Sequence, residues 1–293
     1  MTTPDPGGPT PSGLVGPGER PERPDTLRSV IRTIGEVLMT AGLVVLLFVV
    51  YEVYVTDLVS AGKQREATTA LDDRWKSDPA AAPEDPERVE RFQGLAEGSG
   101  FAKMYVPAFG TDYSFTIIEG TTEKTLEIGP GHYTGTAYPG EPGNFAVAGH
   151  RVGKGAPFND VDLLNSCDAI VVETHYSWFV YRVLPKSEEV AGWAAGKGAD
   201  PRCRGVSPLG GPYAQVVGQE IVAPSQGAVI APVPGQLGAE ASVGEQATLM
   251  TLTTCHPRFS DRERLIVHAV MVQQWAKDPA KPGETPPELK ETS

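Results

Sequence analysis

The sequence predicts an all-β domain, a barrel or a sandwich, preceded by a single membrane-spanning helix. Short runs of β-forming residues follow one another between residues 99 and 275, and Gly and Pro separate them. One apolar stretch near the amino terminus is long enough to cross a bilayer. The remaining segments are rich in Pro, Gly and charged residues, as is typical of tails and linkers.

The first segment, residues 1–32, is expected to be a disordered cytoplasmic tail. It begins MTTPDPGGPTPSGLVGPGERPERPD, which is rich in Pro and Gly and poor in large apolar side chains. Such a segment cannot bury enough surface to offset the entropy lost on ordering. We therefore expect no packed structure at the start of the chain.

Residues 33–56 are expected to form the membrane-spanning helix. The stretch VLMTAGLVVLLFVVYEVYV is apolar except for Glu52, and as a helix it would span roughly 28 Å, close to the hydrocarbon thickness of a bilayer. Arginines precede it and acidic residues follow it, so the positive-inside rule puts the amino terminus in the cytoplasm. A cleaved signal peptide is the alternative, because VSA at Val59–Ala61 resembles a cleavage site.

The rest of the chain divides by composition. Residues 57–98 are charged, Ala-rich and broken by prolines near their end, which is typical of an extracellular stalk or linker. Residues 99–275 form the predicted β-domain, and the polar, Pro-rich residues 276–293 are expected to be a disordered tail. The eight predicted strand-forming runs are FAKMYVPAFG, YSFTIIEG, GNFAVAGH, DAIVVET, YSWFVYRVL, GAVIAPV, ATLMTLTTC and RLIVHAVMVQ.

Composition excludes two classes of function. The net charge of -12 and the pI near 4.9 provide no basic surface for a nucleic acid backbone. The three cysteines, Cys167, Cys203 and Cys255, have no C-x-x-C spacing, which argues against a zinc site or a redox pair. We therefore expect no nucleic acid partner, no metal and no cofactor.

Cys255 is the candidate nucleophile, because it closes a strand where its side chain can reach a groove. A lone free cysteine is more commonly a small buried hydrophobe, and a thiolate nucleophile needs a base or cationic partner to lower its pKa and a donor to hold the oxyanion. His150 ends another strand, and Arg264 begins the strand that a hairpin would return beside Cys255. His256 is a poor base for Cys255, because neighbours on a strand point to opposite faces. His132, in a Gly/Pro loop, is compatible with a catalytic or a structural role.

Two of these segments resemble a known family. TLTTC followed by a loop and RLIVHA resembles the active-site strand pair of sortases, and GHYTGTAYPGEPGNFAVAGHR resembles the segment that carries the sortase histidine. The resemblance extends over roughly residues 99–275. It looks most like class E, the housekeeping class of high-GC Gram-positive bacteria. It implies a sortase-type eight-stranded β-barrel.

The resemblance also implies a role for each matching residue. Cys255 matches the nucleophile, His150 the general acid/base, Arg264 the arginine that steadies substrate and oxyanion, and Thr254 a substrate-binding position that shapes the oxyanion site. The implied protein is a single-pass, membrane-anchored cysteine transpeptidase with its catalytic domain outside the cell. It would cleave an LPXTG-like or LAXTG-like sorting signal of a surface protein between Thr and Gly. It would then transfer that protein to an amine of a lipid-linked peptidoglycan precursor.

Some features stay open at this stage. Residues 191–217 are longer than the connection expected in the family, and they form either an insertion near the substrate groove or a plain surface loop. Cys167 and Cys203 either pair, which leaves Cys255 free, or are isolated thiols.

Two other functions are alternatives to the predicted sortase-type transpeptidase. An L,D-transpeptidase would carry its histidine and cysteine in a Ser-His-Gly-Cys-like run, which is absent from the sequence. A non-catalytic extracellular β-domain that binds cell-wall or partner proteins would bury Cys255, and its thiol would then resist alkylation in the native state.

Overall fold

The structure, a computed structural model, describes residues 26–51, 55–77, 92, 94–238, 246–278, 280–281 and 283–291. The chain divides into two compact units, Met1–Phe48 and Val49–Ser293. The predicted amino-terminal tail up to residue 25 and residues 78–91 of the predicted stalk lie outside the described residues.

The helix α1 (Thr26–Val50) carries the apolar stretch. Among the described residues it is the one helix long and apolar enough to cross a membrane, with a mean hydropathy of 2.3 and none of its residues buried. Length and composition are the only basis of this assignment, which a signal sequence also satisfies. The helix begins earlier than the predicted bound of residue 33, and it fits a single-pass anchor.

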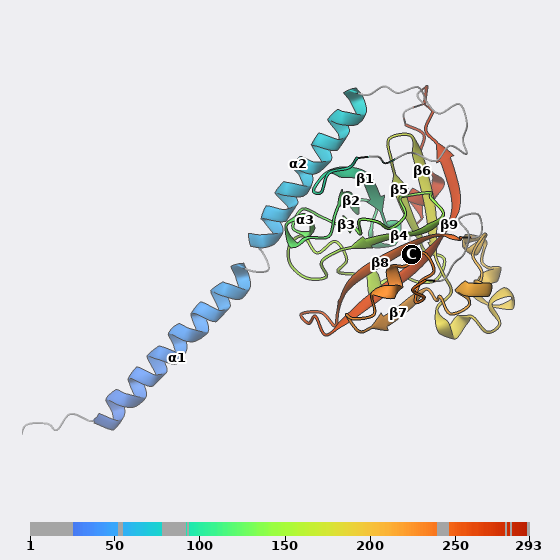
Figure 1. Cartoon of the computed structure of the whole chain (residues 1–293). Coiled ribbons are helices and arrows are strands. Elements are labelled where there is room, and N and C mark those ends of the chain that lie inside the picture. Colours follow the sequence, from blue (N-terminus) through green and yellow to red (C-terminus); the bar gives the residue numbers. More distant parts are fainter. Residues whose placement is uncertain are drawn as a thin grey trace, which may run out of the picture. The chain divides into compact units, whose positions relative to one another are not determined.

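In the described part of the chain, eight strands close into a barrel in the order β6-β5-β1-β2-β3-β4-β8-β9 (Figure 1). Pairing of β6 with β9 completes the circle, and β7 pairs with another part of the long strand β9. This confirms the predicted eight-stranded barrel. The strands are β1 (Gly100–Tyr105), β2 (Ser114–Glu119), β3 (Gly131–His132), β4 (Gly143–Ala148), β5 (Ala169–Glu173), β6 (Ser177–Val183), β7 (Gln219–Val222), β8 (Thr248–His256) and β9 (Glu263–Ala276).

One of the predicted strand-forming runs is wrong. GAVIAPV forms the 3₁₀ helix η9 (Gly227–Ile230), and it is followed by Pro232 and Pro234. Proline has no backbone N–H to give to a ladder, so this run cannot pair along its length as a strand. The barrel takes β3 instead, a strand of two residues that is too short to leave a pattern in the sequence.

The barrel core follows from the alternation of side chains along each strand. Alternate residues of β4, β8 and β9 point inward and are almost fully buried. The residues between them point outward, and these include Cys255 and Arg264. The inward-facing residues of these three strands are Phe145, Val147, Met250, Leu252, Leu265, Val267 and Ala269.

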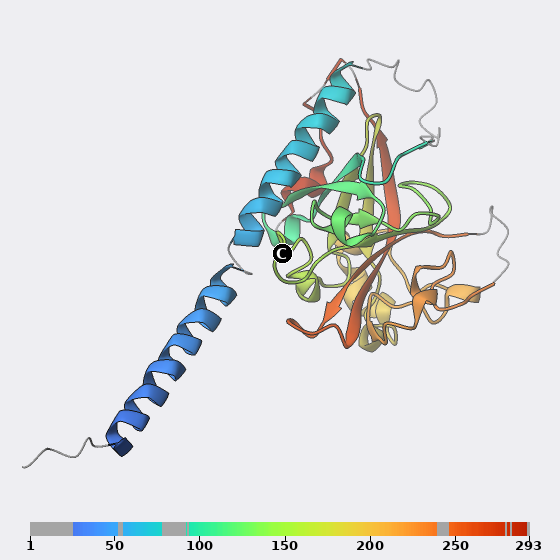
Figure 2. The same ribbon diagram turned by 60° about the vertical axis from the view of Figure 1, so that its left-hand side comes forward.

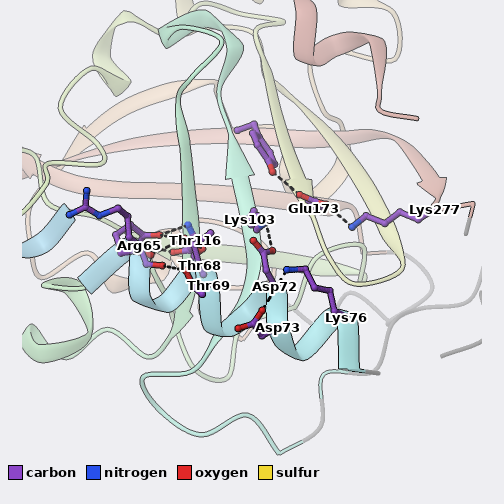
Figure 3. A network of polar contacts seen from close by, with 12 residues as sticks. Arg65, Thr68, Thr69, Asp72, Asp73, Lys76, Lys103, Thr116, Glu173 and Lys277 are labelled. Carbon is purple, nitrogen blue, oxygen red and sulfur yellow. Dashed lines mark hydrogen bonds and ion pairs between the residues drawn. The ribbon is translucent and has the colours of Figure 1, made fainter. Parts of the chain in front are cut away.

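The helix α2 (Thr56–Ser77) packs along β1 and β2 (Figure 1, Figure 2). Gln64 reaches the backbone of Thr116 in β2, where its Oε1 accepts from the amide at 2.7 Å and its Nε2 donates to the carbonyl at 3.2 Å. Figure 3 shows Thr68 and Asp72 of α2 directed at Thr116 and Lys103 of the barrel. Much of the described part of segment 57–98, which was expected to be a stalk, therefore lies against the barrel.

Part of the carboxy-terminal tail also packs on the barrel. Within the segment 276–293, the 3₁₀ helix η11 (Pro287–Lys290) forms, and Glu291 Oε1 lies 2.7 Å from Nη2 of Arg182. Arg182 is buried, so its guanidinium favours a nearby carboxylate. This differs from the disorder expected from composition, because the buried charge that orders the tail lies on β6, far away in sequence.

Cys167 and Cys203 form a disulfide, with their Cα atoms 4.9 Å apart. It ties segment 191–217 to the barrel at the turn before β5, where Trp193 and Val206 pack around it. Cys255 remains free. The other helices in the described residues are α3 (Glu123–Leu126), η2 (Pro107–Phe109), η3 (Val161–Leu163), η4 (Ser187–Glu189), η5 (Trp193–Ala195), η6 (Lys197–Ala199), η7 (Pro201–Cys203) and η8 (Gly211–Tyr213).

Candidate active site

A cleft of about 290 Å³ opens where β4 and β8 end. The loop after β4 forms one wall and the loop between β8 and β9 forms another. The cleft is lined by His150, Arg151, Val152, Cys255, Phe259, Ser260 and Asp261.

Cys255 stands near the end of β8 with its thiol free and partly exposed. In the antiparallel pair of β8 and β9 it lies directly opposite Arg264. Side chains of directly opposite residues project from the same face of a sheet. The hairpin therefore puts a cysteine and an arginine side by side on the outer face of the barrel.

His150 reaches the same cleft from the neighbouring strand. β4 and β8 are parallel and in register up to Ala148 and Thr253, so both strands end at the same edge of the sheet. The hydroxyl of Thr254 donates to the carbonyl oxygen of Gly149 at 2.7 Å. Thr254 is buried, and this bond fastens the residue before His150 to the residue before Cys255.

The surroundings of His150 favour its neutral form. Burial lowers the pKa of its imidazole, the ammonium of Lys154 lowers it further, and the carboxylates of Glu123 and Glu127 act in the opposite direction. Its Nε2 is buried and has no hydrogen-bond partner among the described residues. A neutral imidazole in the cleft can accept a proton from a thiol and return it to a leaving group.

The guanidinium of Arg264 rests on the backbone of its own loop. Its Nη1 donates to the carbonyl oxygens of Asp261 at 2.9 Å and Glu263 at 3.0 Å. The antiparallel pairing with Cys255 fixes the position of the Arg264 backbone. The hydrogens on Nε and Nη2 take no part in the two hydrogen bonds that Nη1 makes. Arg264 therefore begins opposite Cys255 on the sheet, but it is not among the residues that line the cleft.

The comparison with protein families decides the class of this site. The sortase domain, as described by its family model, matches residues 104–272, which carry most of the barrel and all of these side chains. The chain belongs to the sortase family. Sortases are cysteine transpeptidases, and this chain is most similar to class E, in agreement with the resemblance stated from its motifs.

Relatives of this sortase include proteins of Streptomyces and Corynebacterium. Sortase SrtE1 of Streptomyces coelicolor is 30% identical over 274 residues, which are 90% of this chain and 63% of SrtE1. Sortase SrtE2 of the same organism is 28% identical and is covered to 89% of its length. The solved SrtF sortase from Corynebacterium diphtheriae is 45% identical, with a TM-score of 0.59 over 70% of this chain and 99% of that one. The chain therefore spans less than two thirds of the length of SrtE1.

Sequence reasoning about this sortase missed Arg151, which is 4% exposed and lines the cleft. Its Nη1 donates to Nδ1 of His256 at 2.9 Å, and its Nη2 lies 2.9 Å from Oδ2 of Asp162. Nη1 also lies 3.5 Å from the carbonyl oxygen of Cys255. Arg151 thereby links the histidine loop, the end of β8 and η3. Its position next to His150 was the one available signal, and position alone does not distinguish it from a surface arginine.

The other described histidines have structural partners. His132 is fully buried, with Nδ1 at 2.7 Å from Oε2 of Glu119 and Nε2 at 2.9 Å from the hydroxyl of Thr136. His268 is also fully buried, and its Nδ1 lies 2.8 Å from the hydroxyl of Thr251. His132 therefore belongs to the packing of β3, which resolves the ambiguity left by its loop-like sequence.

The described residues offer no cluster of three or more His, Cys, Asp or Glu side chains that could hold a metal ion. The lining of the cleft includes a thiol, an imidazole and the guanidinium of Arg151, and a thiol beside an imidazole suits covalent acyl transfer.

Proposed function

We propose that this chain is a single-pass membrane protein that cleaves an LPXTG-like or LAXTG-like sorting signal between Thr and Gly. It transfers the surface protein to an amine of a lipid-linked peptidoglycan precursor. The observation that carries the proposal is the convergence of Cys255 and His150 on one cleft, with Arg264 directly opposite Cys255. Membership of the sortase family supports the reaction type.

In the first half of the reaction, His150 accepts the thiol proton and the sulfur of Cys255 attacks the carbonyl carbon of the Thr residue. The carbonyl oxygen gains negative charge, and the guanidinium of Arg264 stabilises it. The C–N bond to Gly breaks as His150 returns the proton to the departing amine. The products are a thioester on Cys255 and a peptide with a free amino-terminal glycine.

In the second half, the acceptor amine attacks the thioester carbon while His150 takes one of its protons. The C–S bond breaks, the thiolate regains a proton from His150, and a new amide joins the surface protein to the precursor. The buried, fastened position of Thr254 would hold the backbone around the reacting carbonyl. Thr254 thus supports the oxyanion region through the backbone of Gly149.

The location of the reaction follows from the chain before the barrel. With α1 as a retained anchor and arginines on its amino-terminal side, the amino terminus is cytoplasmic and the catalytic domain is extracellular. Both substrates then meet the cleft at the outer face of the membrane. This arrangement suits a lipid-linked acceptor and surface proteins that carry carboxy-terminal sorting signals.

The proposal is tested with the full chain in detergent and fluorogenic peptides that vary at the second motif position. Cys255→Ala should abolish cleavage, because it removes the nucleophile from a partly exposed site without opening a large cavity. His150→Ala should lose most of the rate, since leaving-group protonation then falls to water. Retained turnover in Cys255→Ala would refute the assignment, and a dead His132→Ala beside an active His150→Ala would move the acid/base role.

Thiol reactivity separates the enzyme from a non-catalytic β-domain. The thiol of Cys255 is free and lines the cleft, so a small alkylating reagent should modify it in the native protein. A native thiol that resists the reagent until the protein is unfolded would favour the binding-domain alternative.

A further inference from the structure

The loop that follows His150 has an unusual backbone. Gly153, Lys154, Gly155 and Ala156 all have positive φ, with values of 63°, 54°, 77° and 34°. Glycine adopts such values easily, but Lys154 and Ala156 carry a Cβ that disfavours them. A conformation of this kind persists only where the surroundings hold it.

The first turn of α2 supplies that support. The carboxylate oxygen Oδ1 of Asp57 accepts from the amide of Gly155 at 2.9 Å, and Oγ1 of Thr56 accepts from the amide of Lys154 at 3.5 Å. Consecutive amides in such a backbone form a concave site that favours a negative charge. Asp57 puts a carboxylate there.

Ion pairs also connect the loop after His150 to α2. Nζ of Lys154 lies 2.8 Å from Oε1 of Glu123 and 3.6 Å from Oε1 of Glu127. Nζ of Lys63, in α2, lies 2.7 Å from Oε2 of Glu127. The two lysines thus share the carboxylate of Glu127, directly after α3, so the loop and α2 are connected through a third segment.

The loop in turn is fastened to the active-site histidine. The amide of Phe158 donates to the carbonyl oxygen of His150 at 3.0 Å, and its ring packs so closely on Gly149 that a Cβ there would lie 2.6 Å from it. Arg151 and Val152, at the start of the loop, line the cleft. The conformation of residues 153–156 therefore determines where one wall of the cleft lies.

The barrel has a contact surface shaped for α2. Gln64 Nε2 donates to the carbonyl oxygen of Ile128 at 3.0 Å, and a Cβ on Gly129 would lie 1.9 Å from that nitrogen. Leu71, at 2% exposed, buries its side chain farther along the same helix. The contact thus combines backbone hydrogen bonds with a buried apolar side chain, and α2 lies beside the loop.

We propose that the first turn of α2 positions the active-site histidine loop, with Asp57 as the positioning residue. The segment that directly follows the membrane helix is then part of the catalytic module. Cleavage after Ala61, at the signal-peptide-like site, would remove Asp57 and release the loop. The inference rests on the proposed function for its effect on rate, while the contact itself is independent of it.

The test uses the full chain in detergent with three variants. Asp57→Ala should lower kcat about tenfold and leave KM within about twofold, because His150 and the wall beside it lose their fixed position while the nucleophile strand is untouched. Asp57→Asn should keep most of the rate, since its amide oxygen still accepts from Gly155. Asp73→Ala, at the exposed other end of α2, is the matched control and should match the wild type.

Hydrogen exchange gives a readout that does not depend on activity. In Asp57→Ala the amides of Gly155 and Phe158 should exchange at least about tenfold faster, with slow exchange retained in β8. In Asp57→Ala, either an unchanged exchange rate of these two amides or an unchanged kcat would overturn the proposal. A wild-type chain without transpeptidation would contradict the proposed function, and the exchange rates would still decide whether Asp57 holds the loop.

Discussion

The pair of Arg151 and Asp162 provides a stability test of the cleft. The Arg151 side chain is 3% exposed and that of Asp162 35% exposed, with Nη2 and Oδ2 2.9 Å apart. Asp162→Asn keeps the shape of the side chain and removes its charge. It leaves the guanidinium buried without its counter-ion.

The size of the effect follows from the burial of the two groups. Breaking a fully buried ion pair by removing one partner costs about 3 to 5 kcal/mol. Water reaches Asp162, and an asparagine oxygen can still accept one hydrogen bond, so we expect a loss of about 2 to 3 kcal/mol. For a domain of this size each kcal/mol lowers the melting temperature by about 2 to 4 °C, which gives a total decrease of roughly 4 to 12 °C.

Thermal unfolding of the full chain, followed by circular dichroism in one detergent, measures this decrease. Asp160→Asn is the matched control, because Asp160 pairs at 3.1 Å with Arg258, which also lies 3.7 Å from Oδ1 of Asp162, and the Asp160 and Arg258 side chains are 44% and 41% exposed. Such a surface pair contributes about 0 to 1 kcal/mol. Equal decreases in the two variants would refute the reasoning that burial of Arg151 sets the cost.

Three further predictions concern the site, the acid stability and the disulfide. Arg264→Lys should lower kcat/KM well below the wild type, because an ammonium cannot present two parallel donors to a carbonyl oxygen. A mild defect in Arg264→Lys beside a severe one in Arg262→Ala would assign the carbonyl-binding role to Arg262 in the loop. Burial raises the pKa of Glu119, but hydrogen bonds with His132, Thr134 and Tyr138 outweigh this and hold it below its ordinary value of 4.5. A carboxylate whose pKa is lower in the folded state than in the unfolded state stabilises the fold above the unfolded pKa, and this stabilisation is lost as the pH falls through the folded pKa. Glu119→Gln should therefore flatten the fall in melting temperature below about pH 4.5, and an unchanged slope would contradict this. Replacing Cys167 and Cys203 by Ser should lower the free energy of unfolding by about 3 to 4 kcal/mol, given their separation of 36 residues, as measured by urea denaturation; two alkylatable thiols at these positions in the unreduced wild type would show that the bond is absent.

Local patterns in the sequence determined much of this protein. The apolar run of α1 is a property of consecutive residues, and the alternation of side chains in runs such as ATLMTLTTC identifies strands without knowledge of their neighbours. The motifs that resemble sortases singled out His150, Cys255 and Arg264, because each of these residues sits beside a strand end that leaves a recognisable pattern. The cleft does bring His150 and Cys255 together, with Arg264 opposite Cys255.

Tertiary structure decided the features whose partners are far apart along the chain. Arg151 and His256 are separated by 105 positions, and Asp57 and Gly155 by 98, so no local pattern joins them. The buried residues of α2 are Ser60, Gln64 and Leu71, a mainly polar set without the apolar stripe that predicts docking. Its contacts with the barrel include hydrogen bonds to backbone groups of β2 and to the carbonyl of Ile128 and ion pairs with Lys103 and Glu127. Those groups become available only after the barrel has formed, which is why the local pattern of a helix that packs on the barrel resembles that of a stalk.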